Sequence, residues 1–142
     1  METQLILKKT VTINASVEKV WDALTNPELI KQYLFGTTAI SDWQEGSSLL
    51  FTGSWEGKEY TDKGTILKLE QNKVLKYNYW SAFSGLPDVP GNYAEITFTL
   101  EPSGNKTRLH LTQGNIANET SLEHSDNNWG EVLKKMNEIL VK

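Results

Sequence analysis

Residues 94–101 read Ala-Glu-Ile-Thr-Phe-Thr-Leu-Glu, a strict alternation of apolar and polar side chains. A period of two predicts a β-strand that turns one face to the core and the other to water. A single wet face is typical of antiparallel sheets, whereas the strands of parallel sheets are apolar on both faces. The stretch therefore predicts an antiparallel sheet whose apolar side needs a cover.

Shorter alternating runs lie on both sides of this stretch, separated by turn residues such as Glu45-Gly46 and Gly104-Asn105. After residue 37 the connections are short enough for antiparallel hairpins, except for residues 81–92. In the first run, Lys9 interrupts the apolar side. The seven expected strands span residues 5–13, 37–42, 47–54, 59–70, 73–80, 93–102 and 106–114.

Three helices are expected. The first begins after Ser16, a preferred N-cap residue, and the second begins with Asn26-Pro27. A polar link containing His124 precedes the third, which would begin at Trp129 and run to the C-terminus. Helices grouped on one side of an antiparallel sheet define the α+β class. The third helix would cover the sheet with an apolar stripe made of Trp129, Val132, Leu133, Met136, Ile139 and Leu140.

Composition limits the function. The 142 residues fit a single domain spanning residues 1–142, with no internal repeat. Without cysteine there are no disulfides and no thiolate chemistry. The net charge is −4 and Arg108 is the single arginine, which argues against nucleic acid as a partner. Residues 1–9 lack a signal-peptide pattern and no apolar run reaches membrane-spanning length, so we expect a cytoplasmic protein without membrane contact.

With this order of elements, the sequence resembles the START-like (SRPBCC, helix-grip) superfamily. Within it, the chain resembles the branch related to the C-terminal domain of the Hsp90 ATPase activator. The resemblance covers nearly the whole chain and rests on the order and spacing of several pieces. These are Val-Thr-Ile-Asn-Ala at 11–15, Val-Trp-Asp-Ala-Leu-Thr at 20–25, Gly-Ser-Trp-Glu-Gly-Lys at 53–58, Lys-Gly-Thr-Ile at 63–66, Leu-Lys-Tyr at 75–77, Trp80, Ile-Thr-Phe-Thr-Leu-Glu-Pro at 96–102, Thr-Arg-Leu-His-Leu-Thr-Gln-Gly at 107–114, and Trp129.

The resemblance implies a curved seven-stranded sheet wrapped around the long C-terminal helix. It also implies a pocket between the two, which relatives use for lipids, hydrophobic metabolites or polyketide intermediates. Relatives in this branch often carry histidine and serine where this chain has Gln113 and Gly114. The full-length co-chaperone has a second, N-terminal domain in addition.

Aromatic side chains are the candidate pocket wall, because rings supply apolar area and hydroxyl or indole groups orient a ligand. The alternative, that each ring only fills the core, stays open. Residues 81–92 form a long connection that would act as a gate with Phe83 at the entrance, or as a permanent flap. The candidate ligand-binding residues are Phe51, Trp55, Tyr60, Tyr77, Tyr79, Phe83, Phe98, Trp129, Leu133 and Met136.

Titratable candidates are few. His110 is expected on the outer face of its strand and His124 in the polar link, at no spacing that binds a metal. Asp62 and Glu59 are candidate acid or base residues of a cyclase-type site, but glycine-marked hairpins around them suggest that both are exposed. No phosphate-binding or hydrolase motif is present. We therefore expect no metal, no cofactor and no catalytic residue.

Three functions are compatible with these observations. The favoured one is non-catalytic binding of a small hydrophobic or amphipathic molecule between sheet and helix. The second is a protein-interaction module of the Hsp90-activator type, with a chaperone, another protein or a second copy as partner and with exposed Trp43 and Trp80 as anchors. The third is a cyclase- or aromatase-like enzyme, which needs a titratable group facing the pocket.

Overall fold

A computed structural model describes residues 5–34, 36–55, 57–81, 87–116 and 119–141, apart from the side chains of residues 55, 90, 115 and 141. It contains one antiparallel sheet with the strand order β1-β7-β6-β5-β4-β3-β2. The elements are β1 (Leu5–Ile13), α1 (Val17–Thr25), α2 (Pro27–Tyr33), β2 (Thr38–Ser41), β3 (Ser48–Trp55), β4 (Lys58–Glu70), β5 (Val74–Tyr79), the 3₁₀ turn η1 (Pro90–Asn92), β6 (Ala94–Ser103), β7 (Lys106–Ile116) and α3 (Glu119–Val141).

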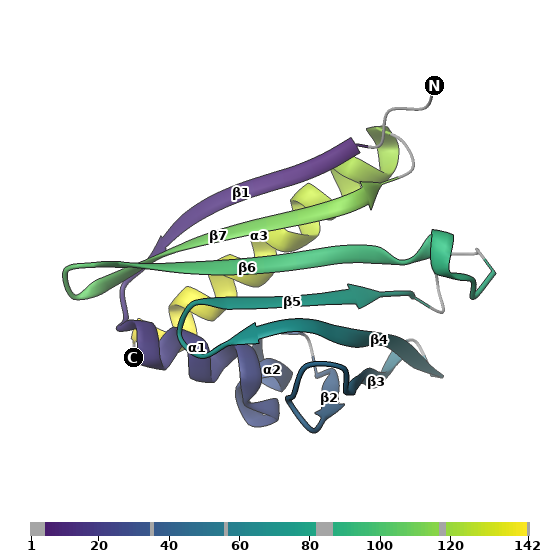
Figure 1. Cartoon of the computed structure of the whole chain (residues 1–142), viewed down its shortest axis with the longest axis horizontal. Coiled ribbons are helices and arrows are strands. Elements are labelled where there is room, and N and C mark those ends of the chain that lie inside the picture. Colours follow the sequence, from purple (N-terminus) through teal and green to yellow (C-terminus); the bar gives the residue numbers. More distant parts are fainter. Residues whose placement is uncertain (1–4, 35, 56, 82–86, 117–118, 142) are drawn as a thin grey trace.

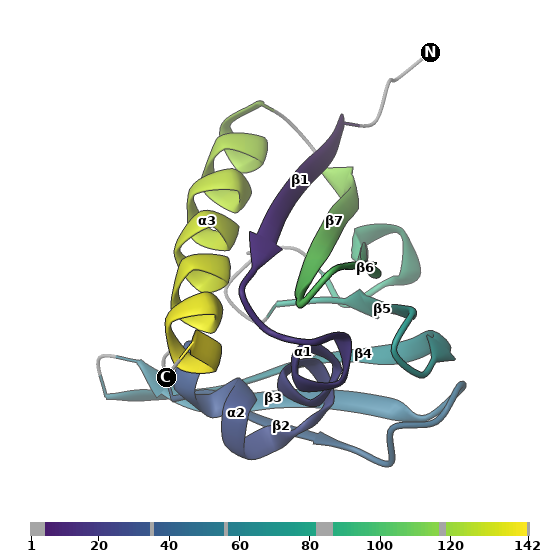
Figure 2. The same cartoon turned by 90° about the vertical axis from the view of Figure 1, so that its left-hand side faces the viewer.

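The three helices lie on one side of the curved sheet. Helix α3 crosses behind the strands in Figure 1, and the turned view of Figure 2 shows it running along one face, with α1 and α2 near its C-terminal end. Seven antiparallel strands and a long C-terminal helix confirm the α+β class and the helix-grip arrangement. The inner face of the sheet, toward α3, is therefore the face on which a pocket would form.

The short helices begin where the capping residues predict. The Ser16 side chain accepts a hydrogen bond from the Lys19 backbone N–H (3.4 Å), and the Asn26 side chain accepts one from the Glu28 N–H (3.0 Å). Pro27 occupies the first turn of α2, where a missing N–H has no consequence. Both caps satisfy backbone donors that a helix start leaves without a partner.

Helix α3 begins at Glu119, ten residues earlier than expected, so the prediction of a polar link up to Trp129 was wrong. His124 lies within the helix. The first half of α3 is polar because its contacts with the sheet are polar: Lys9 is paired with Asp126 at 2.5 Å. The apolar stripe starts only where the helix reaches the apolar part of the sheet, and the stripe alone set the predicted boundary.

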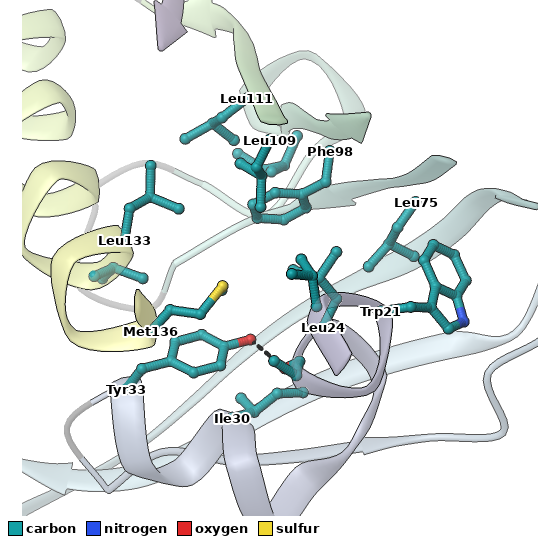
Figure 3. Close-up of a cluster of buried hydrophobic side chains, with 14 of the residues drawn as sticks. Trp21, Leu24, Ile30, Tyr33, Leu75, Phe98, Leu109, Leu111, Leu133 and Met136 are labelled. Atoms are coloured by element: carbon teal, nitrogen blue, oxygen red, sulfur yellow. Dashed lines mark hydrogen bonds between the residues drawn. The ribbon is translucent and has the colours of Figure 1, made fainter. Parts of the chain in front are cut away.

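The core fills the space between α3, the short helices and the sheet. Met136 of α3 and Leu109 and Leu111 of β7 are fully buried. Figure 3 shows Leu133 and Met136 on the sheet-facing side of α3, with side chains of α1, α2 and β5–β7 opposite them. The Tyr33 hydroxyl donates to the Ala23 carbonyl oxygen (2.8 Å), which joins α2 to α1 and satisfies the one polar group of that ring.

Candidate functional site

Five aromatic rings form a continuous row across the inner face of the sheet. Tyr79 and Tyr77 of β5 share that face because successive side chains alternate, Phe51 comes from β3, Phe98 from β6 and Trp129 from α3. Ring centroids are separated by 5.9 Å from Tyr79 to Phe51, 6.0 Å from Phe51 to Tyr77, 6.4 Å from Tyr77 to Phe98 and 5.6 Å from Phe98 to Trp129. We call these five residues the aromatic row. The spacings and tilted rings are those of favourable aromatic packing.

One end of the row is tied to the sheet by an amide. The Trp129 indole N–H donates to Gln113 Oε1 (2.8 Å), and Gln113 Nε2 donates to the Ser125 hydroxyl (3.3 Å). Gln113 is half-buried and faces inward on β7, opposite Ile96 of β6. Its side chain therefore bonds the polar first half of α3 at two points.

The other end of the row carries a buried carboxylate. Asp62 is 6% exposed and accepts a hydrogen bond from the Tyr79 hydroxyl at Oδ2 (2.8 Å). Burial, together with the negative charge of Asp62, raises the pKa of Tyr79 far above its usual value, so Tyr79 stays a proton donor. Burial raises the pKa of Tyr77 in the same way.

The expectation that Asp62 is exposed was wrong, whereas Glu59 is exposed as predicted. The turn that follows Trp55 is separated from Asp62 by the first residues of β4, so Asp62 lies well inside a 13-residue strand. It pairs directly with Phe51 across β3 and β4. Residues paired in this way project to the same face of a sheet, which here is the inner one.

A glycine fixes the distance between β4 and β5 beside this carboxylate. A Cβ at Gly64 would lie only 1.7 Å from the Asn78 carbonyl oxygen, so no other residue fits without backbone movement. The Asn78 side chain in turn accepts a hydrogen bond from the Thr65 N–H (2.6 Å). This close approach helps to place Tyr79 beside Asp62.

A small cavity lies between the aromatic row and the short helices. Its volume is about 20 Å³, about enough for one water molecule. Four predicted residues line it, namely Phe51, Tyr77, Phe98 and Trp129. Seven further lining residues were not among the candidates: Leu24, Ile30, Tyr33, Leu34, Trp43, Leu49 and Leu75.

Four of these seven residues belong to α1, to α2 or to the C-cap of α2, and they close the end of the cavity. The apolar spacing of Ile30, Tyr33 and Leu34 was visible in the sequence. What it could not show is that α2 turns this stripe toward the rings rather than toward the outer edge of the sheet.

The remaining candidates occupy different surroundings. Leu133 and Met136 are buried on the sheet-facing side of α3. The Tyr60 hydroxyl is hydrogen-bonded to Thr37 Oγ1 (2.6 Å). A Cβ added at Gly53 would lie 2.5 Å from this hydroxyl oxygen and 2.7 Å from the Tyr60 ring. The Trp55 side chain and Phe83 lie outside the described residues.

The two tryptophans expected as exposed anchors are both half-buried, so that expectation was wrong. Trp43 lines the cavity with a backbone φ of +54°, and its N–H donates to Ser41 Oγ (3.0 Å). A left-handed conformation is unusual for a bulky residue and costs on the order of 1–3 kcal/mol. Trp80 lies under the Lys63 ammonium, 5.8 Å from the ring centroid.

Only part of the long connection at 81–92 belongs to the described residues, and these lack Phe83. In that part, Asp88 forms an ion pair with Lys63 and accepts a hydrogen bond from the Tyr93 hydroxyl (2.5 Å). The bond to Lys63 lowers the pKa of Asp88 and raises that of Lys63. These contacts hold Asp88 and Tyr93 against Lys63 in the middle of β4.

The outer side of the sheet carries polar groups. His110 projects there as predicted and is hydrogen-bonded to Thr10 Oγ1 (3.0 Å). A groove of about 720 Å³ lies between α1 and the ends of β5–β7, lined by residues such as Glu18, Lys73, Glu101 and Lys106. Both acidic and basic side chains line it, so neither sign of charge dominates. In the part of the chain that the structure describes, no group of three or more His, Cys, Asp or Glu could hold a metal ion.

None of the helices in the described ranges is both long and apolar enough to pass through a bilayer.

The curved sheet, the long helix and the row of rings between them define the class as a helix-grip protein with an aromatic inner face. The chain belongs to the family described as "Activator of Hsp90 ATPase homolog 1-like protein", whose model matches residues 14–141. This agrees with the resemblance seen in the sequence. No match was found among curated proteins.

Several solved structures share the fold. Protein ChR145 from Cytophaga hutchinsonii is 45% identical over 99% of this chain and 96% of that one, with a TM-score of 0.86. Protein MLL2253 from Mesorhizobium loti is 24% identical over 96% of both chains (TM-score 0.79). The Aha1 dimer from Colwellia psychrerythraea is 22% identical over 96% of both (TM-score 0.76). The last two likenesses concern the fold alone.

Proposed function

We propose that the protein binds a small, largely apolar molecule between the aromatic row and the short helices. The observation that carries the proposal is the cavity itself, which lies against three sheet rings of the row and Trp129. Rings with polar groups at both ends of the row suit an amphipathic ligand, because they offer apolar contact and fixed hydrogen-bonding positions together.

A ligand would have to enlarge this cavity. Typical ligand pockets measure about 300–1,000 Å³, against about 20 Å³ here. The lining residues best placed to move are Leu34 and Trp43, which are half-buried, whereas Ile30, Leu49 and Leu75 are fully enclosed. The strained backbone of Trp43 supports this location for the opening, since such strain is often found at ligand sites.

The test combines tryptophan fluorescence and thermal unfolding with a panel of fatty acids, sterols and aromatic polyketides. Trp43 and Trp129 line the cavity, so a ligand there changes their emission. Binding also raises Tm, by about 2–4 °C for each kcal/mol of stabilisation. Leu34→Phe should fill the cavity and abolish both signals. The control is Leu67→Phe, which changes an exposed residue that does not line the cavity.

A panel that changes neither fluorescence nor Tm in the wild-type protein would remove this proposal. Equal responses from the Leu34→Phe and Leu67→Phe variants would show that the ligand binds elsewhere.

A second candidate is a protein-interaction module of the Hsp90-activator type, acting alone or as a homodimer like the Colwellia protein. It is favoured by the small size of the cavity beside the aromatic row, about 20 Å³, because a site too small for a ligand leaves the outer surface as the place of contact. The test measures the ATPase rate of Hsp90 with and without this protein, and its mass in solution by light scattering. An unchanged rate together with a monomeric mass would set this candidate aside.

A further inference from the structure

The polar groups of the aromatic row and of the neighbouring Tyr33 are used within the protein, with one exception. Tyr79, Trp129 and Tyr33 each donate a hydrogen bond to another residue. Within the described ranges, the hydroxyl of Tyr77 has no hydrogen-bond partner, although this residue is only 7% exposed. Burying a donor without a partner is unusual and costly. A phenylalanine would fill the same space without this cost, so packing does not explain the hydroxyl.

The Tyr77 hydroxyl borders the cavity beside the aromatic row. Tyr77 is one of the lining residues, and no fully enclosed side-chain nitrogen or oxygen of the described residues lacks a hydrogen-bond partner. The hydroxyl oxygen of Tyr77 therefore touches open space rather than packed atoms alone. Burial, and then the neighbouring Tyr77, raise the pKa of Tyr33. This effect indicates that the Tyr77 hydroxyl lies on the side of the short helices, as the cavity does.

At neutral pH this hydroxyl is a hydrogen-bond donor. Burial raises the pKa of Tyr77 well above its usual value, so the group stays protonated. A phenol is a better donor than acceptor, because the ring withdraws electron density from its oxygen. Most other lining side chains are hydrocarbon, such as Leu24, Leu49 and Phe98. A charged ligand group would meet a single donor in these surroundings, so its burial would be costly.

We propose that Tyr77 is the polar anchor of the cavity and that its hydroxyl donates a hydrogen bond to an uncharged carbonyl oxygen of the ligand. The apolar body of the ligand lies against the rings of Phe51 and Phe98, which flank Tyr77 in the row. This inference rests on the proposed binding function and adds the chemical class of the ligand. Hydrocarbons lack the acceptor, and carboxylates bring a charge that the site does not neutralise.

The experiment uses three probes of nearly the same shape that differ beside the naphthalene ring. The ketone 2-acetylnaphthalene carries the acceptor, 2-isopropenylnaphthalene has a methylene group in place of the oxygen, and 2-naphthoate carries a carboxylate. Their dissociation constants for the full chain are measured by equilibrium dialysis at pH 7. We expect the ketone to bind most tightly and the carboxylate most weakly. One hydrogen bond in a shielded site predicts an advantage of the ketone over the alkene of about three- to tenfold.

The matched variant is Tyr77→Phe, which removes only the hydroxyl. It should reduce the advantage of the ketone over the alkene to about twofold or less and leave the affinity for the alkene unchanged. Because this hydroxyl bonds to none of the described residues, Tm of the variant should equal or exceed that of the wild type. The control is Tyr33→Phe, since Tyr33 lines the same cavity but its hydroxyl donates to the Ala23 carbonyl oxygen. This control should lower Tm and keep the preference for the ketone.

The two proposals fail in different ways. If none of the three probes binds, the proposed ligand-binding function is overturned and this inference with it. If the ketone binds no more tightly than the alkene, the binding function stands and the role of Tyr77 is wrong. A preference for the ketone that survives in the Tyr77→Phe variant would assign the donor to another group. A marked fall in Tm of that variant, or its failure to fold, would show that the hydroxyl serves stability instead.

Discussion

A hydroxyl that donates a hydrogen bond to a buried carboxylate contributes more to the free energy of unfolding than one that donates to an exposed carboxylate. The chain contains one hydroxyl–carboxylate pair of each kind. Tyr79 donates to buried Asp62 at 2.8 Å, and Tyr93 donates to exposed Asp88 at 2.5 Å. Tyr79→Phe leaves a shielded charge with one donor fewer, so we expect a loss of about 1–3 kcal/mol in the free energy of unfolding. Tyr93→Phe should lose less than about 1 kcal/mol, because water replaces the donor.

Urea unfolding of both variants measures this difference. The comparison holds when the free energy of unfolding falls with urea concentration at a similar slope in the two variants. Equal losses from the two substitutions would mean that the Asp62 carboxylate is effectively solvated.

Single residues were predictable where a local rule determines them. The cap residues Ser16 and Asn26 and the outward position of His110 follow from spacing alone. Burial of Asp62 depends on which residue of β3 pairs with it, and the inward position of Trp43 depends on a left-handed backbone. Neither pairing register nor an unusual φ leaves a signal in one sequence.

Helix α3 is held in two different ways along its length. Its second half packs through Val132, Leu133 and Met136, whereas its first half is attached by the Lys9–Asp126 pair and by Gln113. Hydrogen bonds and partly exposed ion pairs contribute less than apolar burial. The first half should therefore open more readily than the second.

The substitution Gln113→Met tests this division, because methionine has similar length but no amide. The indole N–H of Trp129 loses its acceptor, and the expected loss in unfolding free energy is about 1–3 kcal/mol. Amide hydrogen exchange should accelerate over residues 119–128 and change less over 132–140. Asn137→Ala is the control, since it removes an exposed contact to the Asn14 N–H from the same helix. Uniform acceleration along α3 would contradict the division into two halves.

Elements were predictable from the sequence to the extent that apolar side chains mark them. All seven strands and both short helices lie within a few residues of the expected positions, because alternation and caps recur in each. The start of α3 was missed because residues 119–128 are held by polar partners on β1 and β7, which a search for apolar periodicity cannot detect.

On the scale of the whole molecule, the space beside the aromatic row is either an incomplete core or a closed ligand site. Both are compatible with a cavity of about 20 Å³. They respond differently when a substitution enlarges the cavity. Enlarging a packing defect leaves a void with no route from solvent, whereas enlarging a ligand site whose half-buried lining residues can move aside admits a guest of matching size.

Leu75→Ala enlarges this cavity, and Leu109→Ala creates a void at an equally buried position that does not line it. Each should lower the free energy of unfolding by about 2–5 kcal/mol, and the milder Leu→Val changes serve if the alanine variants do not fold. Saturating 2-methylnaphthalene should raise Tm of the Leu75→Ala variant more than that of the wild type, because the guest no longer has to displace side chains. It should not raise Tm of the Leu109→Ala variant beyond the wild-type response. The same increase in Tm in both variants would mean that the hydrocarbon fills any void. The cavity beside the aromatic row would then not be a specific ligand site.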